Sequence, residues 1–98
     1  MADIDITRAH SLDEAEAQER LDKLVTGFQN KRPDLVKEVK WSTDKKTAVA
    51  TGKLFEGTFV VSAGDVKASV ELKGFAAKMA KGMVTQMIGK MLDRHFPA

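Results

Sequence analysis

Residues 54–73 read LFEGTFVVSAGDVKASVELK, and this stretch decides the fold. In 66–73 every second side chain is apolar, which is typical of a strand with one face in a core and one in solvent. Residues 54–62 alternate in the same way, and only a short segment containing Gly64 separates the two runs. Such close spacing predicts two neighbouring antiparallel strands.

The remaining elements follow from the same two periodicities. We expect further strands at 3–7, 36–42 and 47–52. We expect two helices, at about 12–29 and 75–94. The sequence therefore predicts an α+β protein with a single antiparallel sheet of about five strands. The order along the chain is β-α-β-β-β-β-α, with both helices packed on one face. No linker or repeat divides residues 1–98, so we expect a single domain.

The first helix has a sequence signature for its start. Ser11 and Glu14 fit the S-x-x-E capping box, in which each side chain bonds the free backbone N–H of the other residue. An apolar stripe then follows at helical spacing, formed by Leu21, Leu24, Val25 and Phe28. We therefore expect Ser11 to be the N-cap of this helix.

Composition excludes several classes of protein. The 98 residues contain no cysteine, which excludes disulfides and thiolate chemistry. The net charge of +2 gives no argument for nucleic acid, although residues 1–30 carry −4 and the remainder +6. This split indicates either separate solvated faces or a positive patch that meets an anionic partner. We see no signal peptide and no transmembrane segment, and we expect a cytoplasmic protein.

Catalytic and metal-binding motifs are weak in this chain. Asp3 and Asp5 are two residues apart, but their alternation favours the solvent side of a strand over a metal site. His10 next to Ser11 invites a nucleophile and base interpretation, which competes with the helix cap. His95 ends the last helix, where a cation suits the helix dipole. We therefore predict no catalytic residues, no cofactor and no metal.

Trp41 lies among lysines that could contact phosphates while the ring stacks on a base: Lys37, Lys40, Lys45 and Lys46. The chain contains no tyrosine, and its phenylalanines mostly follow core periodicity. We therefore favour a core position for Trp41 and expect no nucleic-acid partner.

The last helix is broader in its apolar surface than a helix lying on a sheet requires. Its apolar arc spans about 220°, where a stripe of about 100° or somewhat more suffices. The methionines either fill the core or form an adaptable binding face. The predicted binding surface consists of Met79, Met83, Met87, Ile88, Lys78, Lys81 and Lys90. It would serve dimerisation or adsorption to a lipid or polymer surface. Gly82 and Gly89 in the polar arc indicate that a second surface approaches there.

Residues 3–12, DIDITRAHSL, followed by EAEA at 14–17, resemble the polyhydroxyalkanoic acid system protein family. The matching motif residues are Arg8, His10 and Ser11. The likeness covers nearly the whole chain and continues through Trp41, residues 50–52, residues 55–57 and residues 70–72.

The resemblance implies a setting in polyester storage-granule systems and carries over no catalytic residues or cofactor. We therefore expect a non-enzymatic accessory protein of bacterial polyhydroxyalkanoate metabolism, cytoplasmic and associated with granules. It would bind a granule surface or a granule-associated protein through the last helix. One alternative is a homodimeric or small hydrophobic-ligand-binding module with a cavity lined by Trp41, Phe55 and Phe59. Another is an enzyme acting on hydroxyacyl thioesters or polymer chains, with His10 in a cleft near a carboxylate.

Overall fold

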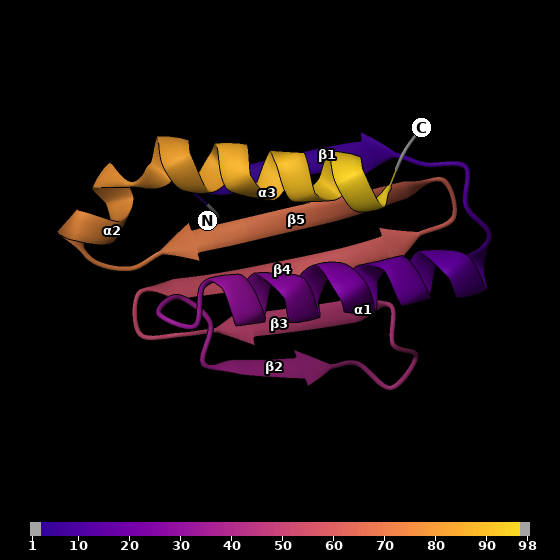
Figure 1. The fold of residues 1–98 in the computed structure, drawn as a ribbon, viewed down its shortest axis with the longest axis horizontal. Helices are drawn as coiled ribbons and strands as arrows, with labels where there is room; N and C mark the ends of the chain where they lie inside the picture. The colour runs from indigo at the N-terminus through magenta and orange to yellow at the C-terminus, as the bar shows by residue number, and fades with distance from the viewer. Residues whose placement is uncertain (1–2, 97–98) are drawn as a thin grey trace.

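Strands β4 (Phe55–Ser62) and β5 (Asp65–Leu72) form the centre of the fold, in a computed structural model that describes residues 3–96. They pair antiparallel along their full length, from Phe55 opposite Leu72 to Ser62 opposite Asp65. The other strands are β1 (Ile4–Ala9), β2 (Glu38–Trp41) and β3 (Thr47–Thr51). Together they form one antiparallel sheet in the order β1-β5-β4-β3-β2 (Figure 1), which confirms the predicted α+β class. Residues 1–2 and 97–98 of the expected single domain lie outside the described residues.

Strand β1 lies at one edge of the sheet, and its partner there, β5, is far from it along the chain. Strands β2 to β5 follow one another as a meander, whereas β1 pairs with β5. Ile4 lies opposite Val70 and Ile6 opposite Ala68. This register places the buried side chains of β1 on the same face as those of β5, so the apolar inner face continues to the sheet edge.

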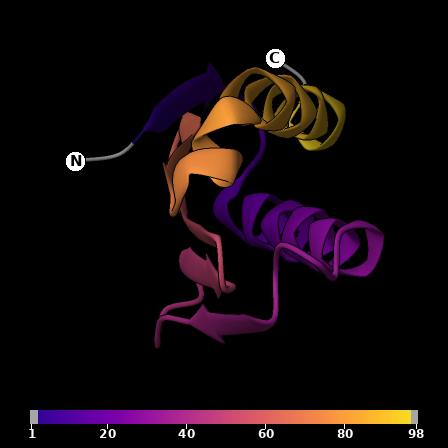
Figure 2. The ribbon, with the colours of Figure 1, turned by 90° about the vertical axis from the view of Figure 1, so that its left-hand side faces the viewer.

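Two long helices, α1 (Glu14–Lys31) and α3 (Lys81–His95), cover one face of the sheet. Figure 2 shows both on the same side, with the opposite side free of helices in the described part of the chain. Helix α1 packs over β4, and α3 packs over β1 and β5. A short helix, α2 (Phe75–Met79), joins β5 to α3. None of the helices in residues 3–96 has the length and apolar character needed to span a bilayer.

The core between helices and sheet is filled by aromatic rings that require a glycine beneath them. Phe55 and Phe59 are fully buried, and Phe28 of α1 meets Phe55 edge-on with ring centroids 5.4 Å apart. A Cβ on Gly57 would lie 2.9 Å from the ring of Phe55 and 3.2 Å from that of Phe59. Each buried ring stabilises the fold by about 1.5–3 kcal/mol. The two rings therefore occupy the space that a side chain at Gly57 would need.

The prediction that Ser11 caps the first helix is wrong. The N-cap is Asp13, whose carboxylate accepts the backbone N–H of Glu16 at 2.8 Å, and α1 begins at Glu14 and ends at Lys31, not at 12 and 29. Asp13 and Glu16 have the same spacing as Ser11 and Glu14, so the sequence offers two capping boxes. Tertiary contacts of the preceding loop, residues 10–12, decide between them.

The prediction of a single helix at 75–94 is also wrong. Ala80 breaks it, because its N–H bonds the carbonyl of Ala77 at 3.0 Å, three residues back, and α3 starts afresh at Lys81. Helix α3 buries Val84 and Ile88 against the sheet, whereas α2 buries only Ala77. The break gives the two helices different axes (Figure 1), so α2 projects at one end of the molecule.

Candidate functional site

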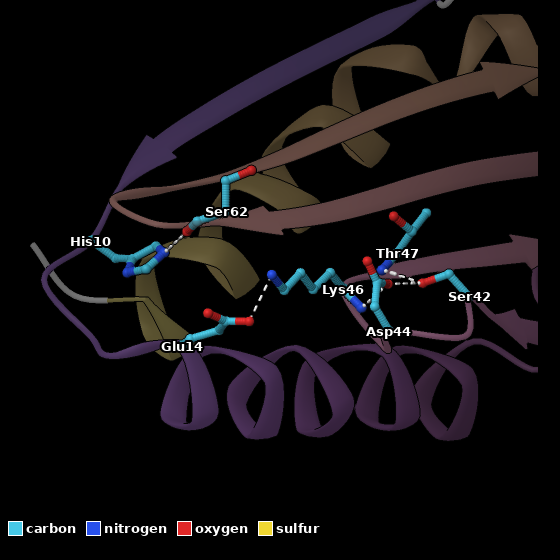
Figure 3. Close-up of polar contacts among 7 residues, drawn as sticks. All are labelled: His10, Glu14, Ser42, Asp44, Lys46, Thr47 and Ser62. Carbon is cyan, nitrogen blue, oxygen red and sulfur yellow. Dashed lines mark hydrogen bonds and ion pairs between the residues drawn. The ribbon is translucent and has the colours of Figure 1, made fainter.

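His10 lies where β1 passes towards α1, and its ring is buried, with 7% of its surface exposed. Its Nε2 is 2.9 Å from the carbonyl oxygen of Ser62 and 3.1 Å from that of Asp65 (Figure 3 shows the first contact). The N–H of Leu12 donates to Nδ1 at 3.2 Å. Since Nδ1 accepts, the neutral tautomer with hydrogen on Nε2 fits these contacts. The ring also packs on Phe96, with centroids 5.5 Å apart.

The contacts of His10 therefore hold the loop before α1 against the turn between β4 and β5. Both ring nitrogens contact backbone groups, and within residues 3–96 neither of them bonds a carboxylate. The same contacts fix residues 10–12 outside the helix, which is why α1 starts after Asp13.

Arg8, the second motif residue, links β1 to α3. Its Nε donates to Oδ1 of Asp93 at 2.8 Å, and a Cβ on Gly89 would lie 3.4 Å from its guanidinium. Gly89 is buried, and the surface expected to approach it is the side chain of Arg8 in the same chain. The remaining motif residue, Ser11, is exposed.

A second set of polar contacts ties the β2–β3 turn to the start of α1 (Figure 3). Nζ of Lys46 lies 2.6 Å from a carboxylate oxygen of Glu14, and this hydrogen bond raises the pKa of Lys46. Within the turn, Asp44 accepts the hydroxyl of Ser42 at 2.5 Å and the backbone N–H of Lys46 at 3.0 Å. These bonds lower the pKa of Asp44. Lys46 is therefore paired with Glu14 and does not belong to the lysine cluster predicted around Trp41.

The carboxylates of Asp3 and Asp5, near the N-terminus, bond to β5 and α2. Asp3 accepts the N–H of Leu72 at 2.8 Å, the main reason its pKa is lowered, and Lys78 donates to it at 3.3 Å. Asp5 accepts the hydroxyl of Ser69 at 2.8 Å. Within residues 3–96, no group of three histidine or carboxylate side chains is placed to hold a metal ion.

Trp41 is only partly buried and lines a groove between α1 and β2 with a volume of about 350 Å³. The side chains of Glu19 and Asp22 line the same groove beside Lys45. The cavity expected between Trp41 and the two phenylalanines is not formed by these three residues, since Phe55 and Phe59 are sealed in the core. The groove is thus mixed in charge rather than positive.

The predicted surface of the C-terminal helices divides into exposed and buried parts. Met79 and Met83 are exposed, at 75% and 52%, whereas Met87 and Met91 are partly buried against the core. Ile88 is fully buried, so its assignment to the surface is wrong: it points to the sheet. Lys81 and Lys90 are exposed, and Lys78 is exposed and paired with Asp3.

Two exposed apolar residues were missed by the sequence analysis. Phe75 is 82% exposed and Leu54 is 41% exposed. A Cβ on Gly74, the residue before Phe75, would lie 3.7 Å from the side chain of Leu54, so the two segments are adjacent. We call Leu54, Phe75, Met79 and Met83 the apolar end patch. The spacing of Phe75 and Met79, one helical turn, was a usable signal, but Leu54 joins them only through the tertiary fold.

These features define a small α+β protein in which two helices cover one sheet face and an N-terminal arginine–histidine motif fastens the helices to the sheet. Residues 4–96 match the model of the family described as "Putative polyhydroxyalkanoic acid system protein". The chain belongs to this family, which confirms the resemblance seen in the sequence. No curated protein and no solved structure gives a significant match to the chain.

Proposed function

We propose that this protein is a non-enzymatic accessory protein that binds the surface of polyhydroxyalkanoate granules through the apolar end patch. A granule presents an apolar polyester under an amphiphilic shell, so it offers a surface on which exposed apolar side chains can be buried. The observation that carries the proposal is the exposure of Phe75 and Met79, at 82% and 75%, on one short helix.

Energetics favour a function for this exposure. Burying a Phe or Met side chain completely is worth about 1.5–3 kcal/mol each. Leaving both in water forgoes that gain, and nothing in the packing of α2 needs them, because α2 buries only Ala77. Flexible methionine also adapts to irregular apolar surfaces.

The charges beside the patch complement an anionic shell. Lys53 precedes Leu54 and Lys81 follows the break at Ala80, and neither has an ion-pair partner within residues 3–96. Lys78 shares Asp3, so it contributes less net charge. Interfacial binding grows with buried apolar area and with attraction between lysines and anionic groups. The patch and its lysines combine both contributions.

Co-sedimentation with polyhydroxybutyrate particles coated with anionic phospholipid tests the proposal. We expect the double variant Phe75→Ser/Met79→Ser to bind at least tenfold more weakly, because each side chain carries more than about 1.4 kcal/mol of the transfer energy. The matched control is Val49→Thr/Val60→Thr, which removes apolar groups from the sheet face that no described helix covers.

Sedimentation velocity without particles tests whether a second copy of the chain, rather than a granule, covers the apolar end patch. A wild-type dimer that becomes monomeric in the Phe75→Ser/Met79→Ser variant would assign the patch to a second copy of the chain. If the folded double variant binds the particles as strongly as wild type does, the apolar end patch does not bind the granule surface.

A further inference from the structure

A second groove, separate from the apolar end patch, runs between α1 and α3 and has a volume of about 350 Å³. It is lined from α1 by Gly27, Asn30 and Lys31, and from α3 by Met91, Arg94 and His95. Its volume is at the lower end of the range for small-molecule sites, about 300–1,000 Å³. The groove is therefore large enough for a compact ligand.

Gly27 leaves one wall of the groove without a side chain. It lies inside α1, where glycine costs roughly 1 kcal/mol of helix stability relative to alanine. At Gly57 and Gly89 a Cβ would meet side chains of the same chain, but at Gly27, as at Gly82, nothing beyond the neighbouring helix backbone lies within 4 Å of that position. Packing within the chain therefore does not require this glycine, whereas any side chain here would project into the groove.

The charges of the groove are of one sign. Its charged lining residues are Lys31 and Arg94, beside the ring of His95, and the lining contains no carboxylate. Arg20 and Lys23 also lie close enough to His95 to lower its pKa, although they are paired with Glu16 and Glu19, respectively. The dipole of α3 accounts for cations in its last turn, but not for a glycine on the facing helix. An apolar floor with a cationic rim is complementary to an anionic head on a short aliphatic chain.

We propose that this groove binds a medium-chain carboxylic acid, with the carboxylate at Arg94 and His95 and the chain over Met91 and Gly27. The guanidinium of Arg94 can bind a carboxylate with two parallel hydrogen bonds. Burial and the neighbouring cations lower the pKa of His95, so at pH 7 it is neutral and serves as a hydrogen-bond donor. The apolar part of the ligand is buried against Met91, whose side chain adapts to irregular surfaces.

Titration of the full chain with octanoate, followed by ¹H–¹⁵N NMR at pH 7.4, tests the proposal. We expect shifts centred on Gly27, Met91 and His95, and at least fivefold weaker octanoate binding in Arg94→Gln. Octanol, which has the chain without the charge, should bind equally to both proteins. Lys67→Gln is the matched control, because it removes an exposed lysine from the uncovered sheet face.

Gly27→Leu provides an independent variant, because it fills the groove without touching the core. We expect it to weaken octanoate binding at least fivefold and to keep or raise the melting temperature. Shifts outside the groove, or affinities of Arg94→Gln and Gly27→Leu within twofold of wild type, would overturn the site. Phosphatidylglycerol vesicles that bind in a Gly27→Leu-sensitive manner, without octanoate binding, would assign it to a lipid surface and also overturn it. Phe75→Ser/Met79→Ser should leave octanoate binding unchanged, so the octanoate proposal and the granule proposal can be refuted independently of each other.

Discussion

Replacing His10 by alanine tests whether the family motif is structural. The change removes the acceptor of the Leu12 N–H and the donor to the carbonyls of Ser62 and Asp65. Each net hydrogen bond is worth about 0.5–1.5 kcal/mol, and the two ring nitrogens together account for about 1–3 kcal/mol. Loss of the contact with Phe96 adds about 1 kcal/mol for the resulting cavity. We expect a destabilisation of about 2–4 kcal/mol, a large share of the roughly 5–15 kcal/mol of a typical domain.

Urea denaturation measures this effect, with the single tryptophan, Trp41, as the fluorescent probe and circular dichroism as a second observable. With a slope of about 1–2 kcal/mol per molar urea, the His10→Ala midpoint should fall by about 2 M. Asp13→Ala, which removes the helix cap, should cost about 1 kcal/mol. Ser11→Ala should stay within about 0.5 kcal/mol, because Ser11 is exposed. A His10→Ala midpoint equal to that of Ser11→Ala would refute the structural role, and a Ser11→Ala cost above that of Asp13→Ala would refute the assigned cap.

Three further predictions follow from single contacts. Gly52→Ala places a Cβ 1.8 Å from the backbone oxygen of Leu35, so we expect a loss above about 3 kcal/mol or failure to fold, measured by circular dichroism and urea. Asp93→Asn removes the exposed ion pair with Arg8 and should cost no more than about 1 kcal/mol; a much larger loss would show that the pair is not solvent-screened. The pKa of His95 is lowered from 6.5 when folded, mainly by burial and then by neighbouring cations, so the unfolded chain binds the proton first as pH falls. Stability should thus decline from pH 6.5 down to the folded pKa, and His95→Gln should remove that part of the decline in urea midpoints; an unchanged slope would contradict it.

The sequence located most elements because strand and helix periodicities are local. The alternation in 54–73 correctly placed the inner faces of β4 and β5, and the apolar stripe of α1 faces the core. Element ends were less certain, since Ser11–Glu14 and Asp13–Glu16 satisfy the same capping pattern. Only contacts of His10 with the distant β4–β5 turn choose between the two.

The candidate sites were predictable only in part. The sequence pointed to the methionines of the last helix, but a helical wheel cannot distinguish a residue facing the sheet from one facing water. Ile88 and Met79 both appeared on the broad apolar arc, and the structure buries the first and exposes the second. Met83, which lies in α3 with Ile88, is also exposed, so the difference depends on which side of the helix faces the sheet.

The sequence by itself determined the class of fold, the strand and helix content, and the family, because these depend on residue types at short spacings. The tertiary structure alone decided that β1 pairs with β5, that Arg8 fills the space above Gly89, and that Leu54 joins Phe75 at one end of the molecule. The physical reason is that such pairings join residues far apart in sequence. Their partners are chosen by packing and backbone hydrogen bonding over the whole core, and no local pattern encodes that choice.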